Sequence, residues 1–352
     1  MNRTKIKGVG HYVPERVVKN TDLEKVMDTS DEWIVERTGI HERRFGARFE
    51  ESTTMLAKKA SEKAIADAGC QPSDIDFIIF ATLSPDYFFP GCGVLLQREL
   101  GICETEIGAL DVRNQCSGFV YGLSVADQFI KTGHYKNILL VGAEMHSMGL
   151  DFTTRGRDVS VIFGDGAGAV VLQPADKGDS SEILSSHLHA DGRHAEELAF
   201  INPGCHGGVH GNKDKQGYSD NEWDSIFVTQ KMLDDHLLFP YMNGQFVFKT
   251  AVKKFPEVIT KALKSAGKSP DELKLVIPHQ ANLRISQFVQ KLLRLRDDQV
   301  YSNIQKYGNT TAASIPIALS EAVEQGVVQR GDLVCLAAFG SGFTWGSVLL
   351  HW

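Results

Sequence analysis

The chain has 352 residues, of which 42% are hydrophobic and 23% are charged, and its formal net charge is −7. These are the values of an ordinary globular protein, and the length suits two lobes that share a large core. The negative charge excludes wholesale attraction to nucleic acid or to an anionic membrane, so we expect no nucleic-acid partner.

The beginning of the chain, MNRTKIKGVGHYVP, contains no long apolar segment, and no apolar stretch elsewhere has the length of a membrane span. We therefore expect neither a secretion signal nor membrane insertion. The six cysteines are scattered without paired spacing, which in a chain of this length indicates free thiols in a reducing compartment. The sequence thus predicts a cytoplasmic protein.

A predicted helix–strand unit begins at Lys63, in KAIADAGCQPSDIDFII, and recurs 198 residues later in KALKSAGKSPDELKLVI. In each copy a glycine, Gly69 or Gly267, stops the helix, and a turn then leads to a buried strand. Two similar halves built from such units predict an α/β fold with mostly parallel sheets covered by helices. We place the boundary near residue 175, which gives halves 1–175 and 176–352.

Cys116 follows the strand-like GALDV and begins a second repeated helix that ends at Gly133; the matching helix runs from Asn309 to Gly326. The N-terminus of a helix stabilises a thiolate, and a thiolate attacks thioesters well. Cys116 is therefore a candidate nucleophile for acyl transfer. The alternative is that it is a small buried hydrophobic residue, as we expect of the cysteines at three other positions, Cys70, Cys103 and Cys335.

Two motifs that suggest a cofactor have structural explanations. GDGAGA at Gly164 resembles a dinucleotide-binding loop, but it continues into the strand-like AVVLQ, whereas such a loop opens a helix. In HLHADGRH, the histidines His187, His189 and His194 follow a strand-like segment and surround an Asp-Gly turn, so we expect no metal there.

Three further segments lie where predicted strands end or helices begin in the second half. His279, in VIPHQANLRI, directly follows the repeated strand, where α/β proteins place site residues. Asn309 opens the helix that matches the one begun by Cys116, although asparagine is also a favoured N-cap. A backbone N–H of the glycine-rich AFGSGFTWGS could bind a developing oxyanion, although the segment is also typical of an ordinary tight turn between two strands. The pseudo-symmetry predicts that Cys116, His279 and Asn309 meet.

Essentially the whole chain resembles the β-ketoacyl-acyl-carrier-protein synthase III enzymes of bacterial fatty acid synthesis. The resemblance is carried by DTSDEWIVERTGIHERR at Asp28, by the segment around Cys116, and then by FGDGAGAVVL, HLHADG, PHQANLRI, GNTTAAS and AFGSGFTWGS in that order. It implies a homodimer and a thiolase-like five-layered αβαβα fold built from two pseudo-repeats, which agrees with the repeat described above.

The resemblance also implies a two-stage reaction that uses a coenzyme A thioester as substrate and needs no cofactor or metal. An acyl-CoA acylates Cys116, malonyl-acyl-carrier protein is decarboxylated, and its carbanion attacks the acyl-enzyme. His279 and Asn309 would stabilise the enolate, and the backbone N–H groups of Cys116 and Ser341 would form the oxyanion hole. The implied coenzyme A contacts are Thr29, Trp33, Arg37, Arg157, Gln245 and Asn282.

Two further roles are implied at the edges of the site. Lys249 and Arg284 resemble the basic residues that receive the acidic carrier protein. In similar enzymes SPDYFFPG reaches across the dimer, so Phe89 is expected to close the partner's acyl pocket. A ring there would restrict primers to the range from acetyl to about octanoyl, because overfilling a packed interior is unfavourable.

Two features leave the pathway open. The stretch from about Pro203 to Tyr241 is longer than in compact members of the family. TLSPD, DVRNQCSG and RGRDVSVIFGDG look more like branches that include secondary-metabolite enzymes. The leading expectation is the initiating condensation of fatty acid synthesis, and the alternative is a related acyltransferase that makes a specialised β-keto product.

Overall fold

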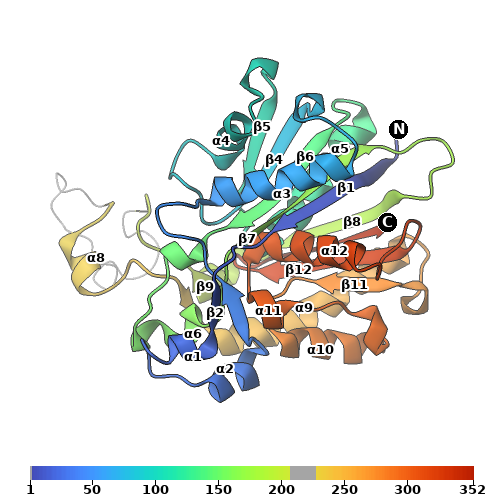
Figure 1. Ribbon diagram of the computed structural model, residues 1–352. Coiled ribbons are helices and arrows are strands. Elements are labelled where there is room, and N and C mark those ends of the chain that lie inside the picture. Colours follow the sequence, from blue (N-terminus) through green and yellow to red (C-terminus); the bar gives the residue numbers. More distant parts are fainter. Residues whose placement is uncertain (1, 207–226) are drawn as a thin grey trace.

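The computed structural model, which describes residues 2–206 and 227–352, contains two mixed β-sheets (Figure 1). The first has five strands in the order β1 (Thr4–Tyr12), β7 (Gly166–Pro174), β6 (Ile138–Glu144), β4 (Phe77–Ala81) and β5 (Gly108–Val112). The second has four strands in the order β11 (Leu275–Pro278), β12 (Leu333–Gly340), β13 (Thr344–His351) and β8 (Glu182–Ala190). The division of the chain at residue 175 stays a prediction.

Only part of each sheet is parallel. β4 runs parallel to β5 and β6, and β11 runs parallel to β12. The remaining neighbours, β1 with β7, β7 with β6, β12 with β13 and β13 with β8, are antiparallel. The prediction of mostly parallel sheets is therefore wrong, because the repeated helix–strand units account only for the parallel pairs. Of the antiparallel pairs, β12 and β13 are joined by a short turn, whereas the others join strands that are far apart in the chain.

Helices cover both sheets and fill the space between them. α3 (Thr53–Asp67) and α4 (Cys92–Glu99) pack on the first sheet, and α9 (Gly244–Ser265) packs on the second with α10 (Leu283–Leu293) beside it. α5 (Gly118–Thr132) and α12 (Ser314–Glu324) contact both sheets. In Figure 1 the first sheet with α3 and α4 lies in the upper half of the view, and the second sheet with α9 and α10 lies in the lower half. The order is helix, sheet, helix, sheet, helix.

The ends of the repeated helices follow from their sequences. The hydroxyl of Ser52 accepts the N–H of Met55 and caps the start of α3, as expected of a serine N-cap. Gly69 after α3 and Gly267 after α9 have φ of 70° and 65°, in the left-handed region that favours glycine. The predicted glycine stops are confirmed, and each is followed by a short 3-10 turn, Pro72–Asp74 or Pro270–Glu272, and then by a buried strand.

The two central helices join the sheets into one body. Phe119 and Leu123 of α5 and Ile315 and Leu319 of α12 are almost completely buried, in one cluster with strands of both sheets. Burying such a side chain contributes about 1.5–3 kcal/mol relative to leaving it exposed. These two helices therefore have fixed positions, and the turns that precede them carry Cys116 and Asn309.

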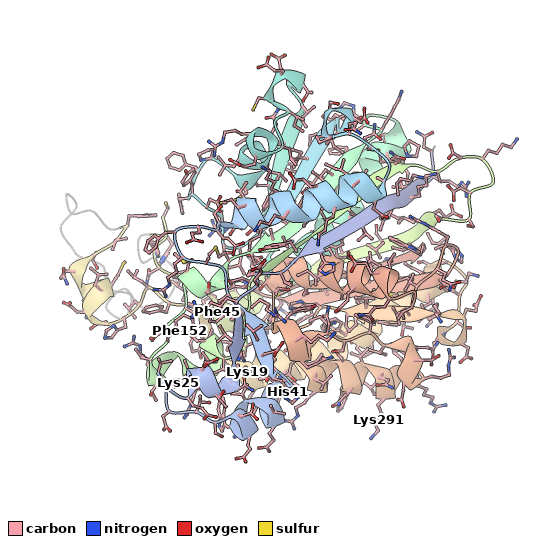
Figure 2. All side chains as sticks on the ribbon, viewed as in Figure 1. Lys19, Lys25, His41, Phe45, Phe152 and Lys291 are labelled. Atoms are coloured by element: carbon pink, nitrogen blue, oxygen red, sulfur yellow. The ribbon has the colours of Figure 1, made fainter. Side chains whose placement is uncertain are left out.

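A small subdomain of short elements lies beside the central body. It consists of β2 (Val17–Lys19), α1 (Asn20–Leu23), α2 (Asp31–Thr38), β3 (Glu42–Arg44), α6 (Arg157–Ser160) and α11 (Ile304–Tyr307). Phe45, after β3, and Phe152, before α6, lie next to one another with ring centroids 5.5 Å apart (Figure 2). Ile34 of α2 is buried in the same apolar cluster as Phe45, which holds α2 and its polar side chains in place.

The remaining elements lie in the long stretch from about Pro203 to Tyr241 and next to it. β9 (Leu198–Ala199) and β10 (Tyr241–Met242) pair antiparallel, and α8 (Gln230–Asp234) lies between them in the chain. Residues 207–226 of the predicted insertion lie outside the described residues. Within residues 2–206 and 227–352, no helix is long and apolar enough to cross a membrane.

Candidate active site

Segments at the ends of strands of both sheets, together with α2, α9 and α10, line a cavity of about 1420 Å³, larger than the ~300–1,000 Å³ of common small-molecule sites. Cys116, His279, Asn309 and Ser341 all line it, so the structure brings together the residues that the sequence singled out. Much of the remaining lining is apolar, including Met145, Leu198, Phe248, Phe255 and Phe339. The cavity thus offers a few polar groups within a largely apolar wall.

Cys116 lies in the 3-10 turn Gln115–Ser117, which leads into α5. Burial, assisted by the nearby Glu144, raises the pKa of the Cys116 thiol to about 12, although backbone N–H groups of Ser341 and of Cys116 itself oppose the shift. N–H groups at the start of the helix thus favour the thiolate as predicted, but burial outweighs them. The resting side chain is a thiol.

The turn after β12 lies directly against this thiol. A Cβ atom added to Gly340 would lie 2.4 Å from Cβ and 2.8 Å from Sγ of Cys116, so only glycine fits there. The hydroxyl of the next residue, Ser341, donates to the carbonyl of Leu198 and is thus directed at β9. The turn presents its backbone to Cys116.

We expect Gly340→Ala to slow acylation of Cys116 by about 100-fold, because relieving the overlap displaces the sulfur or the oxyanion-binding N–H by a fraction of an ångström or more. The rate is measured by quenching the reaction at a series of times and following the acyl adduct by mass spectrometry. Gly192→Ala is the matched control, since an added Cβ there meets no atom within 4 Å. Equal acylation rates in the two variants would show that the close contact is not required.

His279 follows β11 and is buried, with Nδ1 2.6 Å from Oγ of Ser314. The N–H of Gln280 donates to the same hydroxyl oxygen at 3.4 Å, so the hydroxyl hydrogen is available for Nδ1. We take the tautomer in which Nδ1 accepts this hydroxyl hydrogen, which places the ring hydrogen on Nε2. Burial lowers the pKa of His279 to about 3, so the ring is neutral, and Nε2 is buried with no partner among the described residues. Nε2–H is therefore a free donor on the cavity.

Asn309 does not cap a helix. The 3-10 turn Thr311–Ala313 separates it from α12, so the prediction that Asn309 opens that helix is wrong. Its side-chain oxygen accepts the N–H of Thr311 at 2.9 Å, which is the hydrogen bond of an Asx turn. Because a backbone N–H bonds only to the amide oxygen, the NH₂ group of Asn309 is left for a ligand.

An aromatic ring with two arginines occupies the end of the cavity formed by α2. Trp33 and Arg37 line the cavity, and the guanidinium carbons of Arg37 and Arg157 lie 4.5 and 5.0 Å from the centroid of the Trp33 ring. Arg157 and Thr29 lie outside the lining itself, and the buried hydroxyl of Thr29 has no partner among the described residues. A flat ring beside two cations suits a nucleotide base and its phosphates.

Four other predicted contacts line the cavity from α9 and α10: Gln245, Lys249, Asn282 and Arg284. Asn282 also has a structural task, because its oxygen accepts the N–H of Arg284 at 2.9 Å and its NH₂ group donates to the carbonyl of Arg37 at 2.8 Å. It thereby caps α10 and ties that helix to α2.

The adjacent rings of Phe88 and Phe89 lie in different places, one in the cavity lining and the other on the surface. Phe88 lines the cavity and packs edge-on against Phe227 at 5.3 Å between ring centroids. Phe89 is 80% exposed and is not part of the lining. Any effect of Phe89 on an acyl pocket must therefore be exerted on a second copy of the chain.

Three residues near the site were missed in the sequence: Glu144, His146 and Ser314. Glu144 is fully buried, and burial raises the pKa of its carboxyl to about 7 although donors such as the Ser84 hydroxyl oppose the shift. His146 lines the cavity. Both follow the apolar strand NILLVGA, so the strand-end rule that selected His279 would have found them.

The histidines of HLHADGRH have neighbours of other kinds. His187 contacts the hydroxyl of Ser265, His189 stacks on Trp345 at 5.4 Å, and His194 packs edge-on against Phe246 at 4.8 Å. In the part of the chain that the structure describes, no three His, Cys, Asp or Glu side chains are grouped as metal ligands.

Comparison with known proteins gives a consistent result. Residues 110–192 match the family described as 3-oxoacyl-[acyl-carrier-protein (ACP)] synthase III, and residues 263–352 match its C-terminal family. The chain is 43% identical to the beta-ketoacyl-[acyl-carrier-protein] synthase III of Aquifex aeolicus over 99% of both chains, and 45% identical to that of Xanthomonas euvesicatoria over 99% of this chain and 98% of that one.

The structure of the Aquifex aeolicus enzyme superposes on this one with a TM-score of 0.84 at 42% identity, covering 99% of this chain and 100% of the other. This similarity confirms the predicted thiolase-like five-layered fold.

Proposed function

The chain belongs to the 3-oxoacyl-[acyl-carrier-protein] synthase III family, and we propose from this membership that it joins an acyl primer from coenzyme A to malonyl-acyl-carrier protein, initiating fatty acid synthesis. The observation that carries the proposal is the convergence of a buried thiol, an imidazole Nε2–H and an amide NH₂ group on one cavity. A thiol that relays acyl groups beside two neutral donors suits decarboxylative condensation.

In the first stage, Sγ of Cys116 attacks the thioester carbon of acyl-CoA and coenzyme A leaves. One thioester replaces another, so the thiol proton is transferred to the departing sulfur and no net proton is consumed. The backbone N–H groups of Cys116 and Ser341 would stabilise the oxyanion of the tetrahedral intermediate. The closeness of Gly340 to Cys116 supports this assignment, since it brings the N–H of the next residue to the sulfur.

In the second stage, the malonyl group loses CO₂ and becomes an enolate whose oxygen requires hydrogen-bond donors. His279 would supply Nε2–H and Asn309 its NH₂ group, both available because their other polar atoms are already bonded within the protein. Neutral donors suit this step because they stabilise the developing charge without transferring a proton. The enolate carbon then attacks the acyl-cysteine, and the cysteine sulfur leaves as a thiolate that is protonated again from solvent.

The polar side of the cavity would bind the carrier groups of both substrates. Trp33 with Arg37 and Arg157 would hold adenine and phosphate, while Thr29, Gln245 and Asn282 would contact the rest of coenzyme A. Lys249 on α9 and Arg284 on α10 would receive the acidic carrier protein. Lys291, on the same α10, projects outward from the molecule (Figure 2), which supports a basic face on these helices.

In these two stages a thiol, an imidazole, an amide and two backbone N–H groups would supply the contacts to the reacting atoms, so we propose that the reaction uses no cofactor beyond the coenzyme A thioester. Substrates of this kind and scattered free cysteines suit the cytoplasm.

We further propose that the protein acts as a homodimer through β5. This strand is an edge of the first sheet, and an unpaired edge is a template for another strand. Exposed apolar side chains surround it, namely Tyr87, Phe88, Phe89, Val94 and Leu110. A second copy paired along β5 would cover them.

Phe89→Thr is expected to shift the preferred primer toward longer acyl chains, because the ring would then no longer close the pocket of the partner. Wild type should prefer acyl groups from acetyl to about octanoyl, since a closed pocket rejects extra methylenes by about 1–3 kcal/mol each. Relative rates with a series of acyl-CoAs give the profile. Phe288→Thr is the control for loss of an exposed ring, because Phe288 on α10 is 45% exposed and lies outside the cavity lining. An unchanged profile in Phe89→Thr would contradict the proposed floor.

The proposed function is tested by incubating the purified protein with acyl-CoAs and malonyl-acyl-carrier protein. We expect release of CO₂ and a carrier protein that bears a 3-oxoacyl group two carbons longer than the primer. Transfer of the acyl group to another acceptor without release of CO₂ would refute it and favour the specialised acyltransferase.

A further inference from the structure

The turn that carries Asn309 is held by the end of β6. Gly142 and Glu144 are alternate residues of β6 and point to the same side, and His146 follows in the 3-10 turn His146–Met148. A Cβ added to Gly142 would lie 2.3 Å from the carbonyl oxygen of Ala312, so the strand and the turn touch through their backbones. Oε1 of Glu144 accepts the N–H of Ala312 at 3.4 Å.

A third contact between the end of β6 and the turn of Asn309 involves Thr311. Nε2 of His146 lies 2.7 Å from Oγ1 of Thr311, and both residues are buried. Thr311 has φ of 47°, a left-handed conformation that is rare for a β-branched residue and that needs support from its surroundings. This conformation brings the N–H of Thr311 onto the side-chain oxygen of Asn309. His146 thus contacts the residue whose N–H bonds to the side-chain oxygen of Asn309.

We propose that His146 is a positioning residue for the malonyl half-reaction: by holding Thr311 it fixes the amide of Asn309 so that the NH₂ group meets the thioester oxygen. The inference rests on the proposed function. His146 itself is suited to holding rather than to proton transfer, because Nε2 is already bonded and its ring lies 4.8 Å from that of Phe163. Burial and the nearby His279 also keep the imidazole neutral by lowering its pKa to about 3.

The test compares two variants of similar size. His146→Leu fills the same space without a polar atom, whereas the side-chain amide of His146→Gln still reaches the hydroxyl of Thr311. We expect His146→Leu to lower the rate of malonyl decarboxylation by about 10–100-fold, the range for a misplaced group, and to leave acylation of Cys116 nearly unchanged. His146→Gln should restore most of the rate. Thr311→Val should resemble His146→Leu, and the double variant should be no slower than either.

His11→Leu is the control for loss of a partly buried histidine that contacts a hydroxyl. Nδ1 of His11 lies 2.8 Å from the hydroxyl of Ser320, which is on α12, the helix that follows the Asn309 turn. Neither His11 nor Ser320 lines the cavity. The His11→Leu variant should lose about as much stability as His146→Leu but keep the rates of both half-reactions. Equal losses of decarboxylation and acylation in His146→Leu, or a decarboxylation rate equal to that of wild type, would overturn the inference.

A crystal structure of His146→Leu provides a readout that does not depend on activity. We expect Thr311 to leave the left-handed conformation and the Asn309 amide to turn. An unchanged orientation of the Asn309 amide would overturn the inference. Absence of decarboxylation in wild type would instead overturn the proposed function, and the comparison of the two structures would still decide whether His146 orients the amide.

Discussion

Cys116→Ala is expected to abolish formation of the acyl adduct and to lower the condensation rate by at least about 10³-fold, the scale seen when a catalytic nucleophile is removed. Wild type mixed with acyl-CoA should gain the mass of one acyl group per chain, and peptide mapping should locate that group on Cys116. The physical reason is position, since Cys116 is the cysteine in contact with the turn of Gly340 and Ser341.

Cys335→Ala is the matched control for this prediction. Cys335 is also fully buried, and burial raises the pKa of its thiol to about 12, but it lies within β12 and outside the cavity lining. The two substitutions thus delete the same group from similarly apolar surroundings. We expect Cys335→Ala to retain the adduct. An adduct that survives Cys116→Ala would refute the assignment of the nucleophile.

His279→Ala and Asn309→Ala are each expected to slow malonyl decarboxylation by about 10²–10³-fold, the usual cost of removing one donor to a developing oxyanion. Acylation of Cys116 should suffer much less, because the tetrahedral oxyanion of that stage is assigned to backbone N–H groups. Separate assays of CO₂ release and of the adduct distinguish the two stages.

Asn303→Ala controls for the loss of a buried asparagine. The NH₂ group of Asn303 donates to Glu321 at 2.8 Å, and the residue does not line the cavity. It should lower stability without separating the two half-reactions. If His279→Ala and Asn309→Ala both reduced acylation and decarboxylation equally, the proposed roles in enolate stabilisation would be wrong.

Several features were accessible from the sequence because their causes are local. Gly69 and Gly267 stop their helices by adopting a conformation that other residues avoid, so a glycine at the end of an apolar helical pattern was a sufficient signal. His279 was selected because it follows a buried strand, and the carboxyl ends of strands in α/β proteins gather at one edge. The same rule applied to the strand before Glu144 and His146 would have selected them too.

Other features depend on contacts between residues far apart in the chain. The pKa of Cys116 is decided by burial between two sheets, which reverses the local effect of a helix start. Asn309 reads as an N-cap, but Thr311 in its left-handed conformation makes it the acceptor of an Asx turn. That conformation is supported by His146, which lies 165 positions away along the chain.

By itself the sequence therefore determined the repeated helix–strand units, the ends of their helices and the identity of the candidate nucleophile, imidazole and amide, since each depends on residues within one or two turns of the chain. Only the tertiary structure decided the protonation of Cys116, the orientation of the Asn309 amide and the antiparallel strands that complete each sheet. These depend on burial and on partners such as Gly340, which meets Cys116 only after both halves have packed around α5 and α12.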